Sequence, residues 1–394
     1  MHIFNSDHDL ALANLSPNYT PPASAVKMKN DLALLPIWYS DDDSVIAEGE
    51  SNRLFLKNIK KILPISSEII SINSISQKQN ESITPWGWNP ALKKKLLNYG
   101  VRKSILPSDY ELQQLRNYSN RKNAVQILKE LKAEFPGICG ESYFISDLNE
   151  LLTYLDSFKG NKILKMPISG SGKGIIWILD KITDKQTDWC RRVIKQQGGV
   201  VAEPVLNKII DFALEFYLDN GLVSFAGYSL FSTASSGAYT GNKLATDLEI
   251  EKELTKYIPQ ELLFKLRTTL KQKLSTRFPQ YKGFAGVDMM ICDNGLQPCV
   301  EINMRMNMGI VSRVFYDKFI DSKSKGKFII DYFKKEGSAL AFHEKMQREL
   351  PLEIKDGKIT SGYLSLTPVT YDTHYIAYAF SSSFFINLLV AASE

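Results

Sequence analysis

Two carboxylates, an amide and a guanidinium stand at strand spacing in the second half of the chain. Asp288 interrupts an apolar run, and thirteen residues later comes Glu301, followed by Asn303 and Arg305. A carboxylate within an apolar strand is costly unless a partner compensates its charge. Because side chains alternate along a strand, Glu301, Asn303 and Arg305 share one face. This pattern predicts a polar face that binds a charged ligand.

A turn signal between the two segments predicts how they pair. With Asn294-Gly295 as the loop of a tight hairpin, Asp293 faces Leu296 and Asp288 faces Glu301. Like charges directly opposite destabilise a sheet, so a cation is expected between them. Oxygen ligands with one amide suit magnesium, which takes one or two carboxylates and then nucleotide phosphates. The alternative is a hairpin with both acids in solvent, which the apolar neighbours disfavour.

A glycine-rich segment is the second candidate for ligand binding. Lys165 precedes the run Ser169-Gly170-Ser171-Gly172-Lys173-Gly174, whose backbone N–H groups are able to cradle phosphate oxygens. A Walker A loop requires Ser or Thr after its lysine, whereas Gly174 stands there. A dinucleotide fingerprint runs into a helix, whereas these glycines run into a strand pattern. Taken alone, the segment is also compatible with a plain hairpin loop.

Three residues are candidates for substrate contacts. Asp7 and His8 follow the first strand, at the carboxyl edge where α/β proteins bind ligands, and a surface histidine is the alternative for His8. Arg313 follows the acidic hairpin and is a candidate for holding a substrate carboxylate. The segment 232–240 is expected to close over an acceptor or to be a surface loop.

Hydrophobic periodicity predicts the elements that position these residues. Helices are expected at 91–99, 124–134, 148–158 and 259–278, and strands at 3–4, 68–72, 162–166, 174–179, 200–203, 213–218, 284–292 and 296–303. The rigid aromatic segment 84–90 is expected to serve packing. After residue 320 the pattern predicts no clear organisation. The chain is therefore expected to be α/β, with the glycine-rich segment between two antiparallel strands.

This ordered set of motifs resembles the ATP-grasp superfamily, which includes D-alanine–D-alanine ligases and biotin carboxylases. The resemblance covers roughly residues 119–315. It implies an α+β ATP-grasp fold, in which two subdomains clasp ATP after an N-terminal α/β domain. The implied parts are a pre-ATP-grasp domain at 1–118, a small lid subdomain at 119–202, a large subdomain with the metal hairpin at 203–320, and a C-terminal extension completing it at 321–394.

The resemblance also implies roles for individual residues. The implied nucleotide-binding residues are Arg121 or Lys122, Lys165, Ser169, Gly170, Ser171, Gly172, Glu203, Pro204, Leu206 and Asp211, and the implied metal ligands are Asp288, Glu301 and Asn303. Lys165 would contact phosphates. Pro204 lacks an N–H, but its carbonyl and the Leu206 N–H suffice to read an adenine edge. Asp211 would bind the ribose, with Glu215 as a competitor. Arg305 would act on the transferring phosphate, and a salt bridge to Glu301 is the alternative.

The activity implied by the resemblance is an ATP-dependent ligation. A carboxylate, small-molecule or peptide, would be activated as an acyl phosphate and joined to an amine or thiol, with ADP and phosphate released. The implied cofactors are ATP and Mg²⁺, with Mn²⁺ as an alternative. A phosphotransferase and a non-catalytic nucleotide-binding protein remain open, as does a homodimer.

Composition sets wider limits. The 394 residues are 44% hydrophobic and 23% charged, which excludes a disordered or coiled-coil chain. A net charge of +5 without a concentrated basic face argues against nucleic acid. The longest apolar run, 384–392, is too short to cross a membrane. The four cysteines form no metal-ligand or disulfide pattern and, with no secretory signal, predict a cytoplasmic protein.

Overall fold

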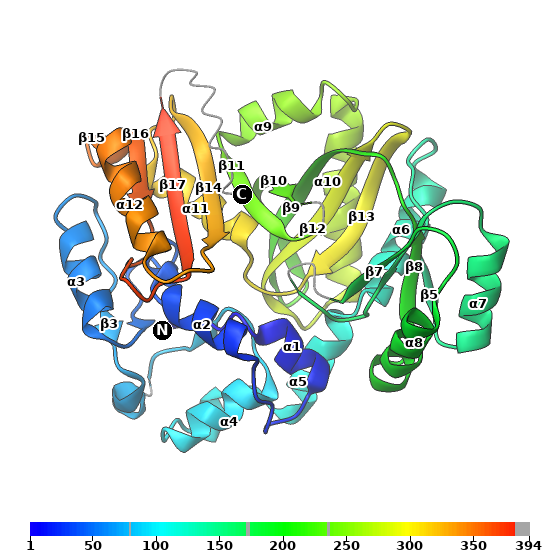
Figure 1. The fold of residues 1–394 in the computed structure, drawn as a ribbon, viewed down its shortest axis with the longest axis horizontal. Coiled ribbons are helices and arrows are strands. Elements are labelled where there is room, and N and C mark those ends of the chain that lie inside the picture. Colours follow the sequence, from blue (N-terminus) through cyan, green and yellow to red (C-terminus); the bar gives the residue numbers. More distant parts are fainter. Residues whose placement is uncertain (79, 171–173, 235–236, 383–394) are drawn as a thin grey trace.

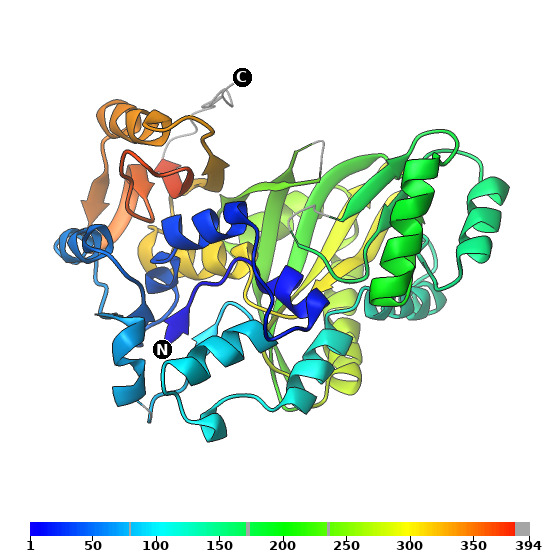
Figure 2. The ribbon, with the colours of Figure 1, turned by 60° about the horizontal axis from the view of Figure 1, so that its bottom comes forward.

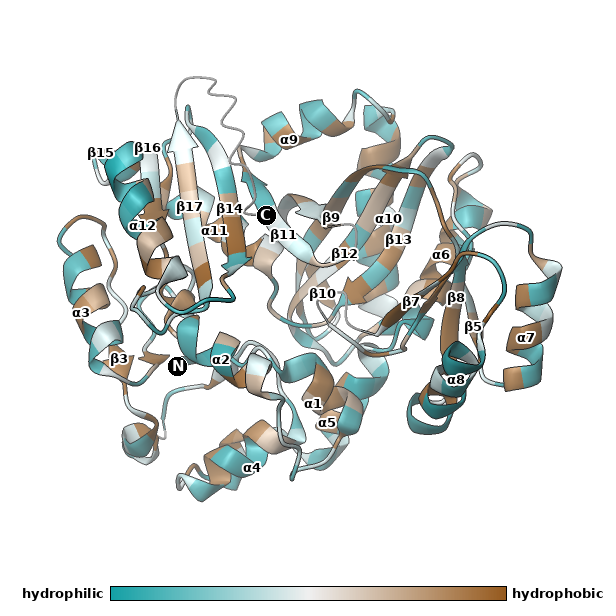
Figure 3. Ribbon diagram, viewed as in Figure 1, coloured by the Kyte–Doolittle hydropathy of each residue, from teal (hydrophilic) through white to brown (hydrophobic). Residues whose placement is uncertain are grey.

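A computed structural model describes residues 1–78, 80–170, 174–234 and 237–382, so Ser171, Gly172 and the apolar run 384–392 lie outside the described residues. The described chain contains three sheets (Figure 1). The mixed α/β class expected from the sequence is confirmed. In Figure 3, outer helices such as α8 (Asp184–Gln197) carry mostly hydrophilic residues, whereas β8 (Val200–Pro204) is mainly hydrophobic.

The N-terminal region has a four-stranded parallel sheet in the order β3-β2-β1-β4. Its strands are β1 (His2–Ile3), β2 (Val45–Ile46), β3 (Ile69–Ile70) and β4 (Thr84–Pro85), and its helices are α1 (His8–Asn14), α2 (Ala23–Asp31), α3 (Glu50–Ile59), α4 (Pro90–Asn98) and α5 (Asp109–Tyr118). Three short 3₁₀ helices are Leu35–Trp38, Ile72–Gln77 and Lys103–Ile105. The aromatic segment after β4 packs as expected, because Trp86 is buried edge-on against Phe4.

A small antiparallel sheet follows, in the order β5-β8-β6-β7. Its other elements are β5 (Tyr143–Ile145), β6 (Lys162–Lys165), β7 (Ile175–Ile178) and helix α7 (Leu148–Ser157). The preceding helix α6 (Lys122–Glu134) buries Ile127 and Leu131 in the core of the large sheet instead. The proposed lid region at 119–202 therefore includes a helix that packs outside its own sheet.

The large sheet has nine antiparallel strands in the order β13-β12-β9-β10-β11-β14-β17-β16-β15. The strands are β9 (Lys208–Asp219), β10 (Leu222–Thr233), β11 (Tyr239–Leu244), β12 (Lys282–Cys292), β13 (Gly295–Asn303), β14 (Lys325–Tyr332), β15 (Glu353–Lys355), β16 (Lys358–Ser365) and β17 (Tyr375–Ser382). The helices are α9 (Asp247–Leu254), α10 (Gln260–Arg277), α11 (Met308–Phe319) and α12 (Ser338–Glu349). Residues after 320, without clear organisation in sequence, thus extend this sheet.

Strand β9 divides the large sheet into an apolar and a polar face. Phe212, Leu214, Phe216 and Leu218 are buried in one core with α10. Strand alternation places Asp211 and Glu215 on the opposite face, where β12 brings Asp288 beside Ala213. The polar face therefore carries the residues expected to do chemistry.

Helix α11 connects the polar face of the sheet to the N-terminal region. The Trp38 ring packs edge-on against Phe315 and Phe319 at centroid distances of 5.2 and 5.3 Å. Trp38 Nε1 also donates to the Leu366 carbonyl at 2.6 Å. Figure 2 shows the first helices lying close to α11 and the C-terminal strands. The N-terminal region is thereby held close to the polar face.

The acidic hairpin β12–β13 pairs partly as expected. Near the turn the pairs are Cys292 with Gly295, Ile291 with Leu296 and Met290 with Gln297. Asp293 and Asn294 therefore form the turn, and the expected Asn294-Gly295 loop and Asp293–Leu296 pair are wrong. A register shift between Asp288 and Met290 then moves the pairing by two residues, which places Asp288 opposite Glu301. The expected carboxylate pair is confirmed, although the turn beneath it is different.

Candidate active site

The centre of the polar face is the carboxylate pair on β12 and β13. Asn303 Nδ2 donates to Asp288 Oδ2 at 3.0 Å, so the three expected metal ligands come together. Burial, with the neighbouring Glu301 and Glu215 carboxylates, raises the pKa of Asp288 well above its usual range. The described residues contain no group of three or more His, Cys, Asp and Glu able to hold a metal. Two carboxylates with an amide are ligands that suit Mg²⁺, which commonly takes further ligands from phosphates.

Arg121 reaches this centre from the start of α6. One guanidinium nitrogen lies 2.7 Å from Glu301 Oε1, and another donates to the Met166 carbonyl at 2.6 Å and to Ser169 Oγ at 2.8 Å. Arg121 Nε is buried without a hydrogen-bond partner among the described residues. Lys122, the alternative expected from sequence, is exposed. Of these two residues, Arg121 is the one whose unpaired Nε would gain a hydrogen-bond acceptor from a bound anion.

Lys165 and Glu203 form a buried ion pair between β6 and β8. Lys165 Nζ lies 2.6 Å from Glu203 Oε2, and Ser142 donates to Glu203 Oε1 at 2.8 Å. Pro204 ends β8, and both Pro204 and Leu206 are half-buried. Strand β8 thus carries the charged Glu203, and the proposed adenine hinge lies at its C-terminal end.

Asp211 lies on the same face as Asp288, two residues along β9 from Ala213, which pairs with Asp288. It pairs with Met290 of β12, and its carboxylate accepts from Thr233 Oγ1 at 2.8 Å and lies 2.5 Å from Lys208 Nζ. An acid held between a hydroxyl and an ammonium at the edge of the face is suitably placed for ribose hydroxyls. This position is compatible with the expected role.

Arg305 pairs with an acid from the N-terminal region, which corrects the sequence analysis. Its Nε donates to Asp9 Oδ1 at 2.8 Å, and a second nitrogen donates to Asn303 Oδ1 at 3.3 Å. The alternative for Arg305, a salt bridge to Glu301, is not found among the described residues, where Arg121 pairs with that carboxylate. A Cβ at Gly170 would lie only 2.2 Å from Asp9 Oδ2, so the glycine-rich segment also reaches Asp9. Asp9, which follows His8 after the first strand, joins three regions.

As expected, Asp7 and His8 follow β1, and they lie at the start of α1. His8 is buried, so the surface-histidine alternative is wrong. Its ring packs on Gly87, its Nδ1 has no hydrogen-bond partner among the described residues, and burial lowers its pKa to about 4. Asp7 is half-buried at the N-cap of α1 and makes no capping hydrogen bond. Neither side chain has a contact with the carboxylate pair in the described part of the chain.

Arg313 belongs to a separate cluster. Its guanidinium donates to the Ala245 carbonyl at 2.7 Å, lies 3.3 Å from Asp247 and forms an ion pair with Asp317. These contacts join α11 to the start of α9. Within the described residues Arg313 therefore bonds to structural partners and not to the carboxylate pair.

Sequence reasoning missed a buried polar group beside the carboxylate pair. Glu215 is 2% exposed and pairs across β9–β12 with Gly286, and Asn307 Nδ2 donates to its Oε2 at 2.9 Å. Burial raises the pKa of Glu215 to about 7. Ser229 accepts from Asn242 Nδ2 at 2.5 Å, and Tyr239 donates to Asn242 Oδ1. The signal available in sequence was a second acid in β9, considered there only as a ribose ligand.

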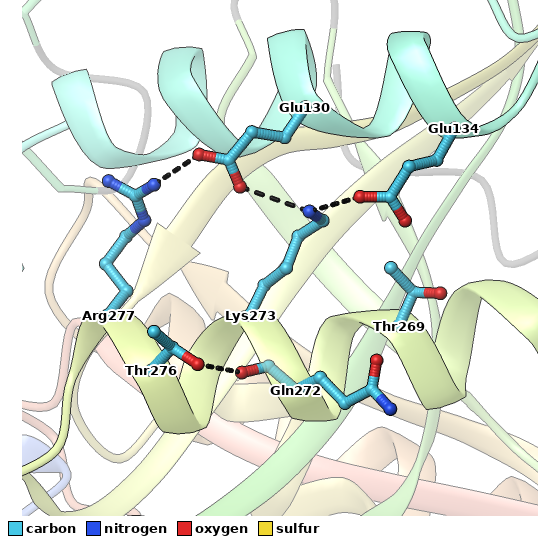
Figure 4. A pocket seen from close by; sticks show the side chains of 7 residues that line it. All are labelled: Glu130, Glu134, Thr269, Gln272, Lys273, Thr276 and Arg277. Carbon is cyan, nitrogen blue, oxygen red and sulfur yellow. Dashed lines mark hydrogen bonds and ion pairs between the residues drawn. The ribbon is translucent and has the colours of Figure 1, made fainter.

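One surface groove lies away from this centre. A groove of about 530 Å³ between α6 and α10 is lined by Glu130, Glu134, Thr269, Gln272, Lys273, Thr276 and Arg277 (Figure 4). Lys273 lies 3.1 Å from Glu130 and 2.7 Å from Glu134, and Arg277 lies 2.5 Å from Glu130. Its charged groups neutralise one another, which is typical of a helix–helix contact.

Two of the expectations from composition concern membrane-spanning helices and cysteines. None of the helices among the described residues is long and apolar enough to cross a membrane. All four cysteines are free thiols.

Comparisons with known proteins address the fold. No family model matches the chain, and no curated protein matches it significantly. A biotin carboxylase β-γ-ATP complex from Campylobacter jejuni superposes with a TM-score of 0.53 at 12% identity, over 97% of this chain and 87% of that chain. A pyruvate carboxylase from Rhizobium etli gives 0.51 at 10% identity, over 86% of this chain and 35% of that chain. An N5-carboxyaminoimidazole synthetase from Staphylococcus aureus with ADP gives 0.48 at 14%, over 86% and 92%.

Proposed function

We propose that this chain, which has the ATP-grasp fold, is an ATP-dependent ligase that activates a carboxylate as an acyl phosphate and joins it to an amine. The observation that carries the proposal is the meeting of two sets of side chains. Arg121, which hydrogen-bonds to the Met166 carbonyl and Ser169 just after β6 of the small sheet, lies 2.7 Å from Glu301 of the carboxylate pair on the large sheet. Lys165 ends the same strand β6, and Arg305 follows β13. Such a meeting suits a polyphosphate held with a metal ion.

The proposed nucleotide contacts follow from the geometry. Lys165, Arg121 and the backbone near Gly170 would bind phosphate oxygens, and Arg121 Nε, which has no partner among the described residues, would donate to one of them. Asp288, Glu301 and Asn303 would hold Mg²⁺, which would neutralise charge between the terminal phosphates. The Pro204 carbonyl and the Leu206 N–H would read adenine, and Asp211 would bind the ribose. The ligand-bound biotin carboxylase is a complex with a form of ATP, which supports this assignment by analogy of fold.

The proposed chemistry requires positioning and charge neutralisation, and no nucleophilic side chain. A substrate carboxylate oxygen attacks the terminal phosphorus, and the bond to the ADP oxygen breaks, giving an acyl phosphate. An amine nitrogen then attacks the acyl carbon, phosphate leaves with its bonding electrons, and the amine loses a proton. Arg305 lies beside Asn303 and would stabilise negative charge on the transferring group.

A direct test measures ADP and AMP release with Mg-ATP across a panel of amino acids, dipeptides and other carboxylates, with hydroxylamine present. The expected result is ADP and a hydroxamate that depend on one carboxylate of the panel. AMP and pyrophosphate would contradict acyl phosphate formation. Phosphorylated product without hydroxamate would favour a phosphotransferase, and nucleotide binding without turnover on any carboxylate would favour a non-catalytic protein.

A further inference from the structure

The charges on the polar face do not balance within the protein. Four acids on this face or beside it have a cationic partner. The pairs are Asp9–Arg305 at 2.8 Å, Glu203–Lys165 at 2.6 Å, Glu301–Arg121 at 2.7 Å and Asp211–Lys208 at 2.5 Å. Two acids, Asp288 and Glu215, receive only an amide hydrogen bond, from Asn303 and Asn307 respectively. Neither forms a salt bridge with another described residue. A ligand that carries positive charge would therefore compensate these two carboxylates.

The magnesium ion proposed above accounts for Asp288 but not for Glu215. Asp288 lies opposite Glu301, whereas Glu215 lies in the neighbouring cross-strand row, opposite Gly286. Its Oε2 already accepts from Asn307. Its Oε1 accepts no hydrogen bond from the described residues. A buried carboxylate with a free oxygen is costly unless a cation or a proton reaches it.

On the side away from the metal hairpin, closely packed polar groups surround Glu215. A Cβ placed on Gly309 would lie 2.1 Å from Glu215 Oε1 and 2.6 Å from Ser229 Oγ, so both oxygens border the same glycine. From Ser229 the hydrogen bonds continue to Asn242 and then to Tyr239. Tyr239 belongs to the segment 232–240, which the sequence marked as a candidate cover for an acceptor. A chain of polar groups therefore leads from this segment to the free oxygen of Glu215.

Low exposure does not set Glu215 apart from the other ligand-binding candidates. It is 2% exposed, while Lys165 and Arg121 are each 6% exposed. All three stand close to the position that the proposed nucleotide would occupy, and all three are enclosed by protein. Glu215 differs from them in having the opposite charge, so its complement is a cation instead of a phosphate.

We infer that Glu215, with Ser229 and Asn242 beside it, forms the acceptor subsite and binds the amine substrate through its ammonium group. This inference rests on the proposed function and names the charge of its second substrate. In water at neutral pH an aliphatic amine is protonated, and it becomes a nucleophile only after one proton leaves. Glu215 Oε1 takes that proton, the nitrogen lone pair attacks the acyl carbon, and phosphate departs with its bonding electrons and the second proton that the nitrogen loses. A nucleophile that arrives neutral needs the carboxylate much less.

The test compares two nucleophiles of equal size that differ in charge at neutral pH, methylamine (protonated) and hydroxylamine (mostly neutral). The full-length wild type and Glu215→Gln are incubated with Mg-ATP and the carboxylate that supports turnover in the panel. Methylamide and hydroxamate are quantified by mass spectrometry. Glu261→Gln, which neutralises an exposed carboxylate on α10, is the matched control. Circular dichroism and thermal melting establish that each variant is folded.

The expected result is a ratio of methylamide to hydroxamate that falls about tenfold or more in Glu215→Gln, as for the loss of one charge-assisted hydrogen bond. The ratio stays at the wild-type value in Glu261→Gln. If Glu215→Gln does not fold, Ser229→Ala is expected to lower the same ratio to a smaller extent.

The failures of the inference and of the proposed function are distinguishable. Hydroxamate formed by the wild type with an unchanged ratio in Glu215→Gln would contradict the acceptor subsite alone. An equal loss of both products would assign Glu215 to carboxylate activation and would also contradict it. No hydroxamate from the wild type with any carboxylate would contradict the proposed function, and the acceptor subsite with it.

Discussion

The groove between α6 and α10 and the candidate active site are both built from ion pairs, but only the groove balances its charges. In the groove two acids meet two bases, and Lys273 alone contacts both Glu130 and Glu134. On the polar face Asp288 and Glu215 have no cationic partner among the described residues. The unmatched buried charge is therefore the basis of the proposed ligand site, and the balanced groove carries no comparable feature.

The largest expected effect comes from breaking the buried pair of Lys165 and Glu203. Lys165→Met leaves Glu203 buried with only Ser142 as a partner, so we expect a loss of about 3–5 kcal/mol in the free energy of unfolding. Urea denaturation measures this loss. The double variant Lys165→Met/Glu203→Gln is expected to recover most of the stability but not the affinity for a non-hydrolysable ATP analogue. Recovered affinity would exclude Lys165 as a phosphate ligand.

A comparable effect, on rate instead of stability, is expected at Arg305. Arg305→Ala removes a cation adjacent to the transferring group, so kcat is expected to fall by about 10²–10³-fold while KM for ATP changes much less. Steady-state ADP release measures both quantities. A rise in KM with unchanged kcat would show that Arg305 serves ground-state binding only.

A smaller effect concerns the pH dependence of stability. The pKa of Glu215 is raised by burial from its ordinary 4.5 to about 7, so the folded protein holds this proton more tightly than the unfolded chain. The resulting stabilisation is present in acid and is lost as pH rises from about 4.5 to about 7. Relative to the wild type, Glu215→Gln should gain up to about 3 kcal/mol between those limits.

Denaturation of both proteins across this pH range measures the difference. His8, whose pKa burial lowers to about 4, acts in the opposite sense in both proteins and therefore cancels. A constant difference between wild type and variant would contradict the raised pKa of Glu215.

The smallest effect is expected in the balanced groove. Glu130→Gln weakens partly exposed ion pairs with Lys273 and Arg277, so we expect a change of at most about 1 kcal/mol in unfolding free energy. Nucleotide affinity and turnover should match those of the wild type. A large loss of turnover would remove the distinction between the two clusters.

The sequence was most informative where chemistry and strand period coincide. Glu301, Asn303 and Arg305 were placed on one face by alternation and Asp288 opposite Glu301 by hairpin register, and the structure brings the four together. Asp288 and Glu301 face each other for a reason that the sequence analysis gave only in part, because the turn lies one residue earlier than expected and a register shift restores the pairing. Turn position and bulges depend on competition between neighbouring backbone geometries, which residue types alone do not decide.

Contacts between distant segments could not be predicted from one sequence. Arg305 pairs with Asp9 nearly three hundred positions earlier, and Glu301 pairs with Arg121. Both pairs depend on how α11 and α6 pack on the large sheet. The strands after residue 320 were missed for a similar reason, since β14 places lysines beside an apolar stretch and acquires order only as a neighbour of β17 in the sheet.

The most direct test of the account is whether magnesium and nucleotide bind together at the unmatched carboxylate pair. Isothermal titration of a non-hydrolysable ATP analogue, with Mg²⁺ and with EDTA, is compared between wild type, Asp288→Asn and Glu130→Gln. We expect Mg²⁺ to tighten nucleotide binding in the wild type and in Glu130→Gln, and to have almost no effect in Asp288→Asn. Equal affinity with and without Mg²⁺ in the wild type, or a magnesium effect retained by Asp288→Asn, would contradict the account.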